Sequence, residues 1–210
     1  MKSWDVIVIG SGAAGFAAAV TACCKGLSVL MLEKAPQFGG TSAISGGAVW
    51  INDSDQARAQ NKSGSPEAMQ TYLQTIIGAE NYRPEVVDAF ITSGREALAF
   101  LEKEGAVKYS LRPLSPDYYP DEPGAVDVGR ALEVVEFDGR RLGARFRDLR
   151  SPPPGMLLFG GMMVNRVDIQ HFLDMRRSLR SFVWCSRLLL RFGRDRLKYP
   201  RAPGWRWATP

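Results

Sequence analysis

Apolar residues in the first 32 positions form two short runs separated by an alanine-rich stretch. The first run is Val6–Ile9, the second covers residues 27–32, and alanines dominate residues 13–25. A continuous apolar run bounded by turn residues is typical of a buried strand, and an alanine-rich stretch of this length is typical of a helix. The pattern therefore predicts a strand, a helix and a second strand, which together form an α/β unit.

Apolar residues then recur at helix spacing through the middle of the chain. One set follows a Ser-Pro-Glu sequence at 65–67 and another follows Pro84, so we expect two helices that cover the sheet or the cofactor domain. Extended segments are expected at residues 106–111, 132–137 and 157–164.

The turn between the first predicted strand and helix carries the sequence Gly10-Ser11-Gly12-Ala13-Ala14-Gly15. In this context Gly10 permits a tight turn, Gly12 lets the backbone approach a pyrophosphate and Gly15 lets the helix lie close to the strand. The helix N-terminus offers N–H groups and a positive dipole end to phosphates. Glu33 ends the second strand, where a carboxylate accepts hydrogen bonds from ribose hydroxyls. This segment predicts a dinucleotide site.

A second glycine-rich segment follows Glu33-Lys34. Its sequence is Gly39-Gly40-Thr41-Ser42-Ala43-Ile44-Ser45-Gly46-Gly47. Small residues with backbone N–H groups and several hydroxyls suit a loop that packs beside a diphosphate and the edge of an isoalloxazine ring. A nicotinamide enzyme has no need of such a loop directly after its ribose-binding acid, so the pair of motifs favours FAD.

Residues 5–15, Glu33-Lys34 and residues 39–51 resemble the opening of the flavoproteins related to fumarate reductase, most closely the 3-ketosteroid dehydrogenases. The resemblance implies a Rossmann-like FAD-binding domain, here with an incomplete sheet, helical additions and the start of a substrate domain. It assigns FAD contacts to Gly10, Ser11, Gly12, Ala13, Ala14, Gly15, Glu33, Lys34, Gly39, Gly40, Thr41, Ser42, Ser45, Gly46 and Gly47.

In the succinate dehydrogenase branch of these flavoproteins, a histidine in this loop holds the flavin covalently. Its place is taken here by a residue of the Gly40-Thr41-Ser42 run. We therefore expect FAD to be bound without a covalent link.

A tyrosine-containing segment, Pro116-Asp117-Tyr118-Tyr119-Pro120 and onward to Gly124, is followed by Gly129-Arg130 and by residues 137–143. It resembles the active-site loop of 3-ketosteroid dehydrogenases. The resemblance implies that one tyrosine of this loop faces the steroid and supports a proton-abstracting tyrosine. This role falls to Tyr118, with Tyr119 as the second choice. In the reaction that the resemblance implies, a hydride passes to the flavin. Without the resemblance, tyrosines between prolines indicate a rigid, packed loop equally well.

Charge is distributed unevenly along the chain. Residues 1–139 hold 11 Lys or Arg and 18 Asp or Glu, whereas residues 140–210 hold 16 and 4. The basic part includes one amphipathic helix expected over 168–196. We interpret its arginines as a solvated face of a helix that caps the substrate region, with contact to phosphates or to an anionic membrane surface as the alternative.

The remaining features indicate a cytoplasmic protein with no nucleic-acid partner, and the resemblance implies a small, hydrophobic, steroid-like substrate. The sequence shows no basic leader, no membrane span of about 20 apolar residues and only three cysteines, which we expect to be reduced. His171 has Asp168 and Asp174 one turn to either side, but without further His or Cys ligands this is a poor metal site. We expect a structural role for His171 and no bound metal.

The sequence divides into a predicted FAD-binding part at 1–150, which includes the tyrosine loop, the start of a substrate or cap region at 151–200, and an atypical tail at 201–210. A doubly wound sheet has roughly five or six strands, and one strand-helix-strand unit is evident. We therefore expect the N-terminal portion of a longer flavoprotein, inactive alone and binding FAD weakly or not at all. Three alternatives remain: a flavoenzyme acting on fumarate or another unsaturated or keto substrate, a noncatalytic remnant or subunit, and a basic binding module.

Overall fold

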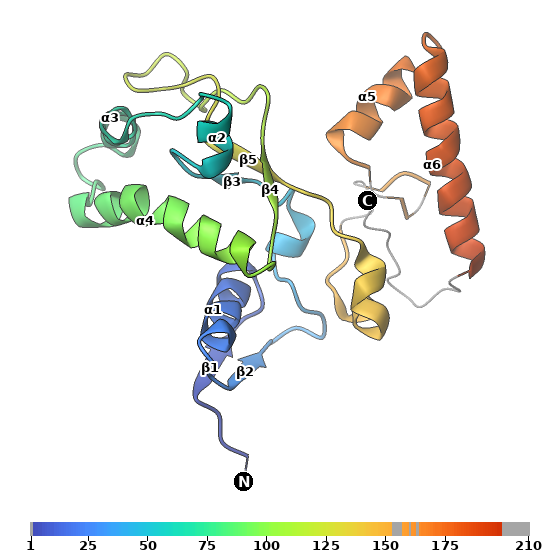
Figure 1. The fold of residues 1–210 in the computed structure, drawn as a ribbon, viewed down its shortest axis with the longest axis horizontal. Helices are drawn as coiled ribbons and strands as arrows, with labels where there is room; N and C mark the ends of the chain where they lie inside the picture. Colours follow the sequence, from blue (N-terminus) through green and yellow to red (C-terminus); the bar gives the residue numbers. More distant parts are fainter. Residues whose placement is uncertain (1, 153–156, 160, 163, 199–210) are drawn as a thin grey trace. The chain divides into compact units, whose positions relative to one another are not determined.

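A computed structural model of the chain describes residues 2–152, 157–159, 161, 162 and 164–198 (Figure 1). The described residues form two compact units. The first contains the described residues of 1–8, 16–30 and 46–135, and the second contains those of 9–15, 31–45 and 136–198.

The predicted strand-helix-strand unit is confirmed. It consists of β1 (Val6–Ile9), α1 (Ala13–Cys24) and β2 (Val29–Leu32). Backbone hydrogen bonds join Val6 to Ser28 at 3.1 Å and Gly10 to Leu32 at 2.7 Å, so the two strands run in the same direction. Among the described residues this Rossmann-like sheet has two strands, which agrees with the expected incomplete sheet.

The rest of the first unit packs three helices with an antiparallel sheet of order β3-β5-β4. The helices are α2 (Asp55–Ala59), α3 (Pro66–Ile77) and α4 (Pro84–Lys103), and the strands are β3 (Val49–Trp50), β4 (Tyr109–Leu111) and β5 (Ala131–Val134). The core lies between them and contains Ala57, Leu98, Leu111 and Leu132. The Ser65 side chain accepts a hydrogen bond from the Ala68 amide, which fixes the start of α3 where the sequence predicted it.

The described part of the second unit contains two 3₁₀ segments, the first of them within the second glycine loop, and two helices. These are η1 (Ser42–Ile44), η2 (Gly139–Asp148), α5 (Arg166–Asp174) and α6 (Leu179–Lys198). The expectation of one helix over 168–196 is wrong. Asn165 and Asp168 form a capping box that starts α5, and the Ser178 hydroxyl accepts a hydrogen bond from the Ser181 amide where α6 begins.

The helices α5 and α6 pack through polar contacts. The indole nitrogen of Trp184 donates to Asp168 at 2.9 Å, and His171 Nδ1 lies 3.0 Å from the Ser181 hydroxyl. Cys185 is buried in the same face, and burial raises the pKa of its thiol. His171 therefore has a packing environment between the two helices.

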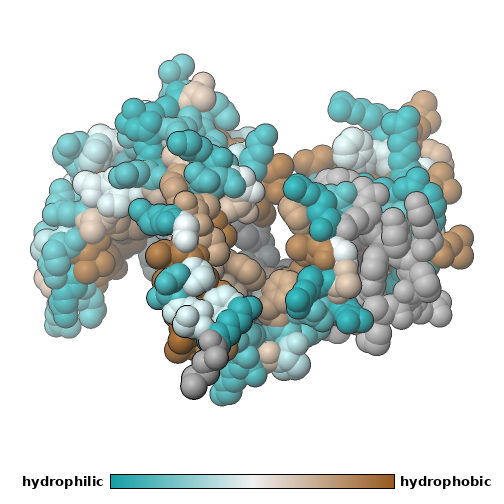
Figure 2. Space-filling model, turned by 60° about the horizontal axis from the view of Figure 1, so that its bottom comes forward, coloured by the Kyte–Doolittle hydropathy of each residue, from teal (hydrophilic) through white to brown (hydrophobic). Residues whose placement is uncertain are grey.

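Many apolar side chains of α6 face solvent. Apolar side chains reach the surface at several places in the molecule (Figure 2). Those exposed on α6 include Leu179, Phe182, Val183, Leu190 and Leu197. The buried face of α6 uses Ser181, Cys185 and Asp195 in their place.

The predicted extended segments form only in part. The strand expected at 106–111 is shortened to Tyr109–Leu111, and the one at 132–137 is found at Ala131–Val134. Within 157–164, a single bridge joins Leu158 to Met162, while residues 160 and 163 lie outside the described residues, as does the tail at 201–210. Of the helices that the structure describes, none is long and apolar enough to cross a membrane.

Candidate functional site

The first glycine motif forms the turn that connects β1 to α1. Gly10 has φ +93°, a value that costs glycine little and other residues much more. Its amide donates to the carbonyl of Leu32 at 2.7 Å, and α1 begins three residues later at Ala13. The turn thus brings the N-terminus of α1 next to the end of β2, where the sequence placed a nucleotide.

Glu33 lies at this end of β2 and is held as a carboxylate by three hydrogen bonds. Its oxygens accept from the Ala35 amide at 2.9 Å, from the Ser11 amide at 3.0 Å and from the Ser11 hydroxyl. Hydrogen bonds to the charged form stabilise it, so the Ala35 amide first, then Ser11, lower the pKa of Glu33 from 4.5 to about 2. The side chain is exposed, and its ionised oxygens are available to ribose hydroxyls.

Two serine hydroxyls join the second glycine loop to the first. Ser11 is 1% exposed, and its hydroxyl donates to Glu33 while it accepts from the Gly39 amide at 2.9 Å. The Ser42 hydroxyl accepts from the Ala13 amide at 2.9 Å, at the N-terminus of α1. The structure therefore brings together five of the residues assigned to FAD, all in the second unit: Ser11, Ala13, Glu33, Gly39 and Ser42.

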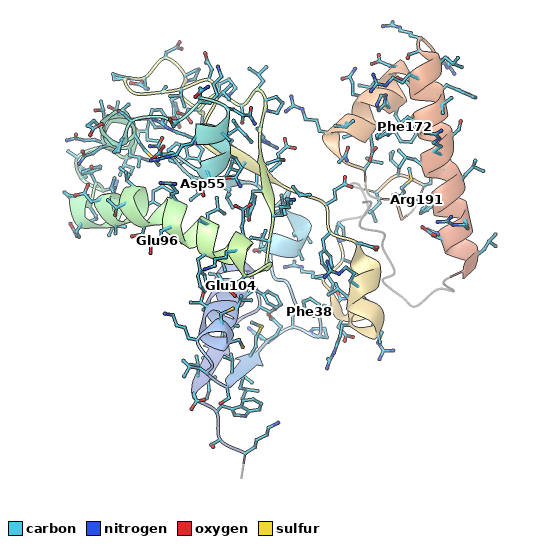
Figure 3. All side chains as sticks on the ribbon, viewed as in Figure 1. Phe38, Asp55, Glu96, Glu104, Phe172 and Arg191 are labelled. Atoms are coloured by element: carbon cyan, nitrogen blue, oxygen red, sulfur yellow. The ribbon has the colours of Figure 1, made fainter. Side chains whose placement is uncertain are left out.

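The backbone of the second loop packs directly against the first. Gly39 and Gly40 have φ +107° and +53°, and a Cβ on Gly40 would lie 3.4 Å from the Cα of Gly12. Phe38, labelled in Figure 3, anchors the loop through a backbone bridge to Leu149, just after η2. The sequence did not predict this bridge because its partners are more than a hundred residues apart.

Gly12 leaves its own side of the turn open. A Cβ at this position would meet one neighbouring atom within 4 Å, the Ser42 hydroxyl oxygen at 3.6 Å. A glycine with open space on its Cβ side, a helix N-terminus and an ionised carboxylate are the groups that bind the diphosphate and ribose of a dinucleotide. The residues present fit such a cofactor.

The other residues assigned to FAD are distributed as follows. Ala14 and Gly15 lie in the first turn of α1, Lys34 is exposed, Thr41 precedes η1, and Ser45 donates its hydroxyl to the Ser42 carbonyl at 2.9 Å. Gly46 and Gly47 belong to the first unit, where a Cβ on Gly47 would lie 2.8 Å from a methyl carbon of Val134 in β5. Their contacts with FAD stay a prediction.

The two tyrosines proposed for catalysis lie in the first unit on an exposed loop. The side chain of Tyr118 is 98% exposed and that of Tyr119 is 58% exposed. The Tyr119 amide donates to the hydroxyl of Tyr72 in α3 at 3.2 Å, which holds the loop backbone. Their role toward a substrate stays a prediction.

A buried network beneath this loop was not predicted from the sequence. Arg130, 1% exposed, donates to Asp117 at 2.6 Å, to the Gly124 carbonyl at 2.9 Å and to Asn52 at 3.3 Å. Asp117 also accepts from the Trp50 indole nitrogen at 2.8 Å. Asp117 and Arg130 both stand in the segment that resembles the active-site loop, and this was the only signal in the sequence. It does not indicate that the two side chains pair.

The titration of Glu33 tests the geometry of the site. A carboxyl-carbon NMR titration of the folded chain is expected to give Glu33 a midpoint of about pH 2. Because the pKa of the folded state is lowered, the stability that this carboxylate contributes is complete above pH 4.5 and is lost as pH falls toward 2. Ser11→Ala should raise the midpoint toward 4.5. A wild-type midpoint near 4.5 would show that the three hydrogen bonds do not form.

Comparison with known proteins adds to this geometry. Residues 5–190 match the family described as FAD binding domain. A 3-oxosteroid 1-dehydrogenase of Mycobacterium tuberculosis is 43% identical over 144 residues, which cover 69% of this chain and 25% of that protein. A 4-oxocyclohex-2-ene-1-carboxylate 5-dehydrogenase of Sinomonas cyclohexanicum is 37% identical over 197 residues, 94% of this chain and 33% of that protein.

A solved structure is similar over nearly the same extent. It is the crystal structure of 3-ketosteroid delta1-dehydrogenase from Sterolibacterium denitrificans in complex with 1,4-androstadiene-3,17-dione, with a TM-score of 0.76 and 34% identity. The match covers 95% of this chain and 34% of that one. The chain thus spans about a quarter to a third of the length of these relatives.

Proposed function

The chain belongs to the family of FAD-binding domains, and from this premise we propose that its two glycine loops hold the adenosine diphosphate half of a noncovalently bound FAD. The observation that carries the proposal is the cluster of Ser11, Glu33 and Gly39, in which one buried hydroxyl joins the ribose-binding acid to the second loop. Gly12 contributes the open backbone surface for the diphosphate.

The chemistry of the second loop supports a noncovalent link. Gly40, Thr41 and Ser42 offer hydroxyls and amides but no imidazole, and the single histidine of the sequence is His171 in α5. Free cysteines at positions 23 and 24 on the exposed surface of α1 suit a reducing compartment, so the proposal includes a cytoplasmic location. It includes no nucleic-acid partner.

We further propose that the protein takes part in dehydrogenating a 3-ketosteroid. The relatives with this activity and the tyrosine loop support the assignment. When bound, FAD would supply the hydride acceptor, while this chain would hold the cofactor and present the phenol of Tyr118 to the substrate. The exposed phenol of Tyr118 is free of packing constraints that would keep it from a bound molecule.

A cyclic keto acid is the second candidate substrate. The observation that favours it is the Sinomonas cyclohexanicum 4-oxocyclohex-2-ene-1-carboxylate 5-dehydrogenase, which is 37% identical over 94% of this chain. The tyrosine loop would serve the same role toward a smaller ring. In this case a carboxylate-binding group would be needed as well.

The two candidates are separated by ligand titrations followed on the tyrosine ring signals in NMR. We expect 1,4-androstadiene-3,17-dione to shift the signals of Tyr118 and Tyr119, and 4-oxocyclohexanecarboxylate and fumarate to leave them in place. Tyr82, whose hydroxyl lies buried elsewhere in the first unit, is the internal control. A response to the keto acid alone would favour the second candidate, and no response to any ligand would contradict a substrate role for the loop.

A further inference from the structure

A buried hydrogen-bond network connects the strand after the second glycine loop to the base of the tyrosine loop. We propose that Asp117 is a positioning residue that ties Trp50 in β3 to the loop carrying Tyr118 and Tyr119. This inference rests on the proposed function, because it concerns how the tyrosine loop is held relative to β3, the strand that follows the second glycine loop. All the residues involved belong to the first unit.

The carboxylate of Asp117 receives hydrogen bonds from three directions. Trp50 Nε1 donates to one oxygen at 2.8 Å, and Arg130 Nη1 and the Val126 amide donate to the other at 2.6 and 3.0 Å. Asp117 is 5% exposed, so these bonds form away from water, where losing one is costly. The carboxylate thus fixes three separate segments at one point.

The same contacts close the tyrosine loop at its base. The Asp117 amide donates to the Val126 carbonyl at 3.0 Å, and the guanidinium of Arg130 donates to the carbonyl of Gly124. Tyr118 and Tyr119 lie between these anchors. Their phenols are exposed while the loop backbone on either side is held, which suits side chains presented to a ligand.

Trp50 provides the link toward the end of the second glycine loop. It lies three residues after Gly47, which is assigned to FAD, and its neighbour Val49 pairs with Leu132 of β5. The Trp50 ring stacks on Phe90 with 6.3 Å between centroids, and the Arg130 guanidinium lies 5.4 Å from its centre. The indole is therefore fixed by packing, and its N–H has one defined direction, toward Asp117.

The buried Asp117–Arg130 pair fixes the position of the loop backbone in addition to filling the interior of the unit. A buried ion pair is weak evidence for stability alone, since apolar residues of equal volume often stabilise as well or better. Here the pair satisfies a loop carbonyl, a loop amide and an indole at once. Its distinctive property is that it determines where the loop backbone lies.

The test uses Trp50→Phe, which removes the N–H donor and keeps an aromatic ring. Amide hydrogen exchange by NMR on the full chain is expected to show roughly tenfold or faster exchange at Tyr119 and Val126. Amides of α3 and α4 should keep their wild-type rates. The matched control is Trp184→Phe, which removes an indole hydrogen bond of 2.9 Å to Asp168 in the other unit. It should leave the loop amides unchanged.

The NMR signals of the tyrosine rings distinguish a positioning role of Trp50 from a role in stability alone. In Trp50→Phe the ring signals of Tyr118 and Tyr119 should shift while the thermal midpoint changes no more than in the control variant. Tyr72→Phe, which removes the acceptor of the Tyr119 amide, should shift the same signals.

Two results would overturn the proposal. One is unchanged exchange at Tyr119 and Val126 in Trp50→Phe, and the other is equal acceleration of every amide in the unit, which would reveal a purely structural role. Both are read without FAD. A failure of FAD binding would be seen separately, in the cofactor titration.

Discussion

Gly12→Ala is expected to weaken FAD binding about 5- to 150-fold while the chain keeps its fold. The added methyl group would meet only the Ser42 hydroxyl at 3.6 Å, which is ordinary contact, so folding should be little affected. It would, however, occupy the surface where the backbone approaches the diphosphate. Overpacking of a close contact costs about 1–3 kcal/mol, which corresponds to that range of affinity.

The measurement is a titration with FAD, followed by flavin fluorescence and by amide signals in NMR. Gly193→Ala in α6 is the matched control, since a Cβ there has no neighbour within 4 Å and should leave the affinity unchanged. Equal FAD affinity in Gly12→Ala and the wild type would place the diphosphate elsewhere.

Gly124→Ala is expected to lower the free energy of unfolding strongly. Gly124 has φ +80°, and a Cβ would lie 2.1 Å from the Ala68 carbonyl oxygen and 3.1 Å from the Tyr72 amide nitrogen, both backbone atoms of α3. The unfavourable φ costs about 1–2 kcal/mol and the overlap about 1–3 kcal/mol. We therefore expect a loss of about 2–5 kcal/mol in the free energy of unfolding.

Urea unfolding measures this loss, and Gly105→Ala separates its two causes. Gly105 has a similar φ of +71° but open space around it, so its substitution should cost only the backbone contribution. If the two variants lose the same stability, the tyrosine loop does not pack on α3 as described.

Local patterns along the sequence predicted the elements that depend on local chemistry. The apolar runs gave β1 and β2, and Ser65-Pro66 marked the start of α3. The division of α5 from α6 was missed because apolar spacing continues across residues 175–178. The helix starts are instead set by local hydrogen bonds, the capping box of Asn165 and Asp168 for α5 and the Ser178 hydroxyl for α6. The elements β3 and α2 are too short to show a period.

In the candidate site, too, local patterns predicted the local features but not the contacts between distant residues. The spacing of Gly10, Gly12 and Glu33 predicted a ribose-binding acid next to a glycine turn, and the structure brings these residues together. The double hydrogen bond of the Ser11 hydroxyl could not be predicted, because its partners depend on how two loops pack. The pair of Trp50 and Asp117 is 67 residues apart, and no local pattern encodes such a contact.

The most direct test of the central proposal, that the two glycine loops hold the adenosine diphosphate half of FAD, is an amide NMR titration of the full chain. FAD should shift signals of residues 10–15, 33–35 and 39–42, with weak affinity, and FMN, which lacks the adenylate, should leave them in place. Shifts confined to the arginine-rich helix α6, or no shift at millimolar FAD, would contradict the proposal.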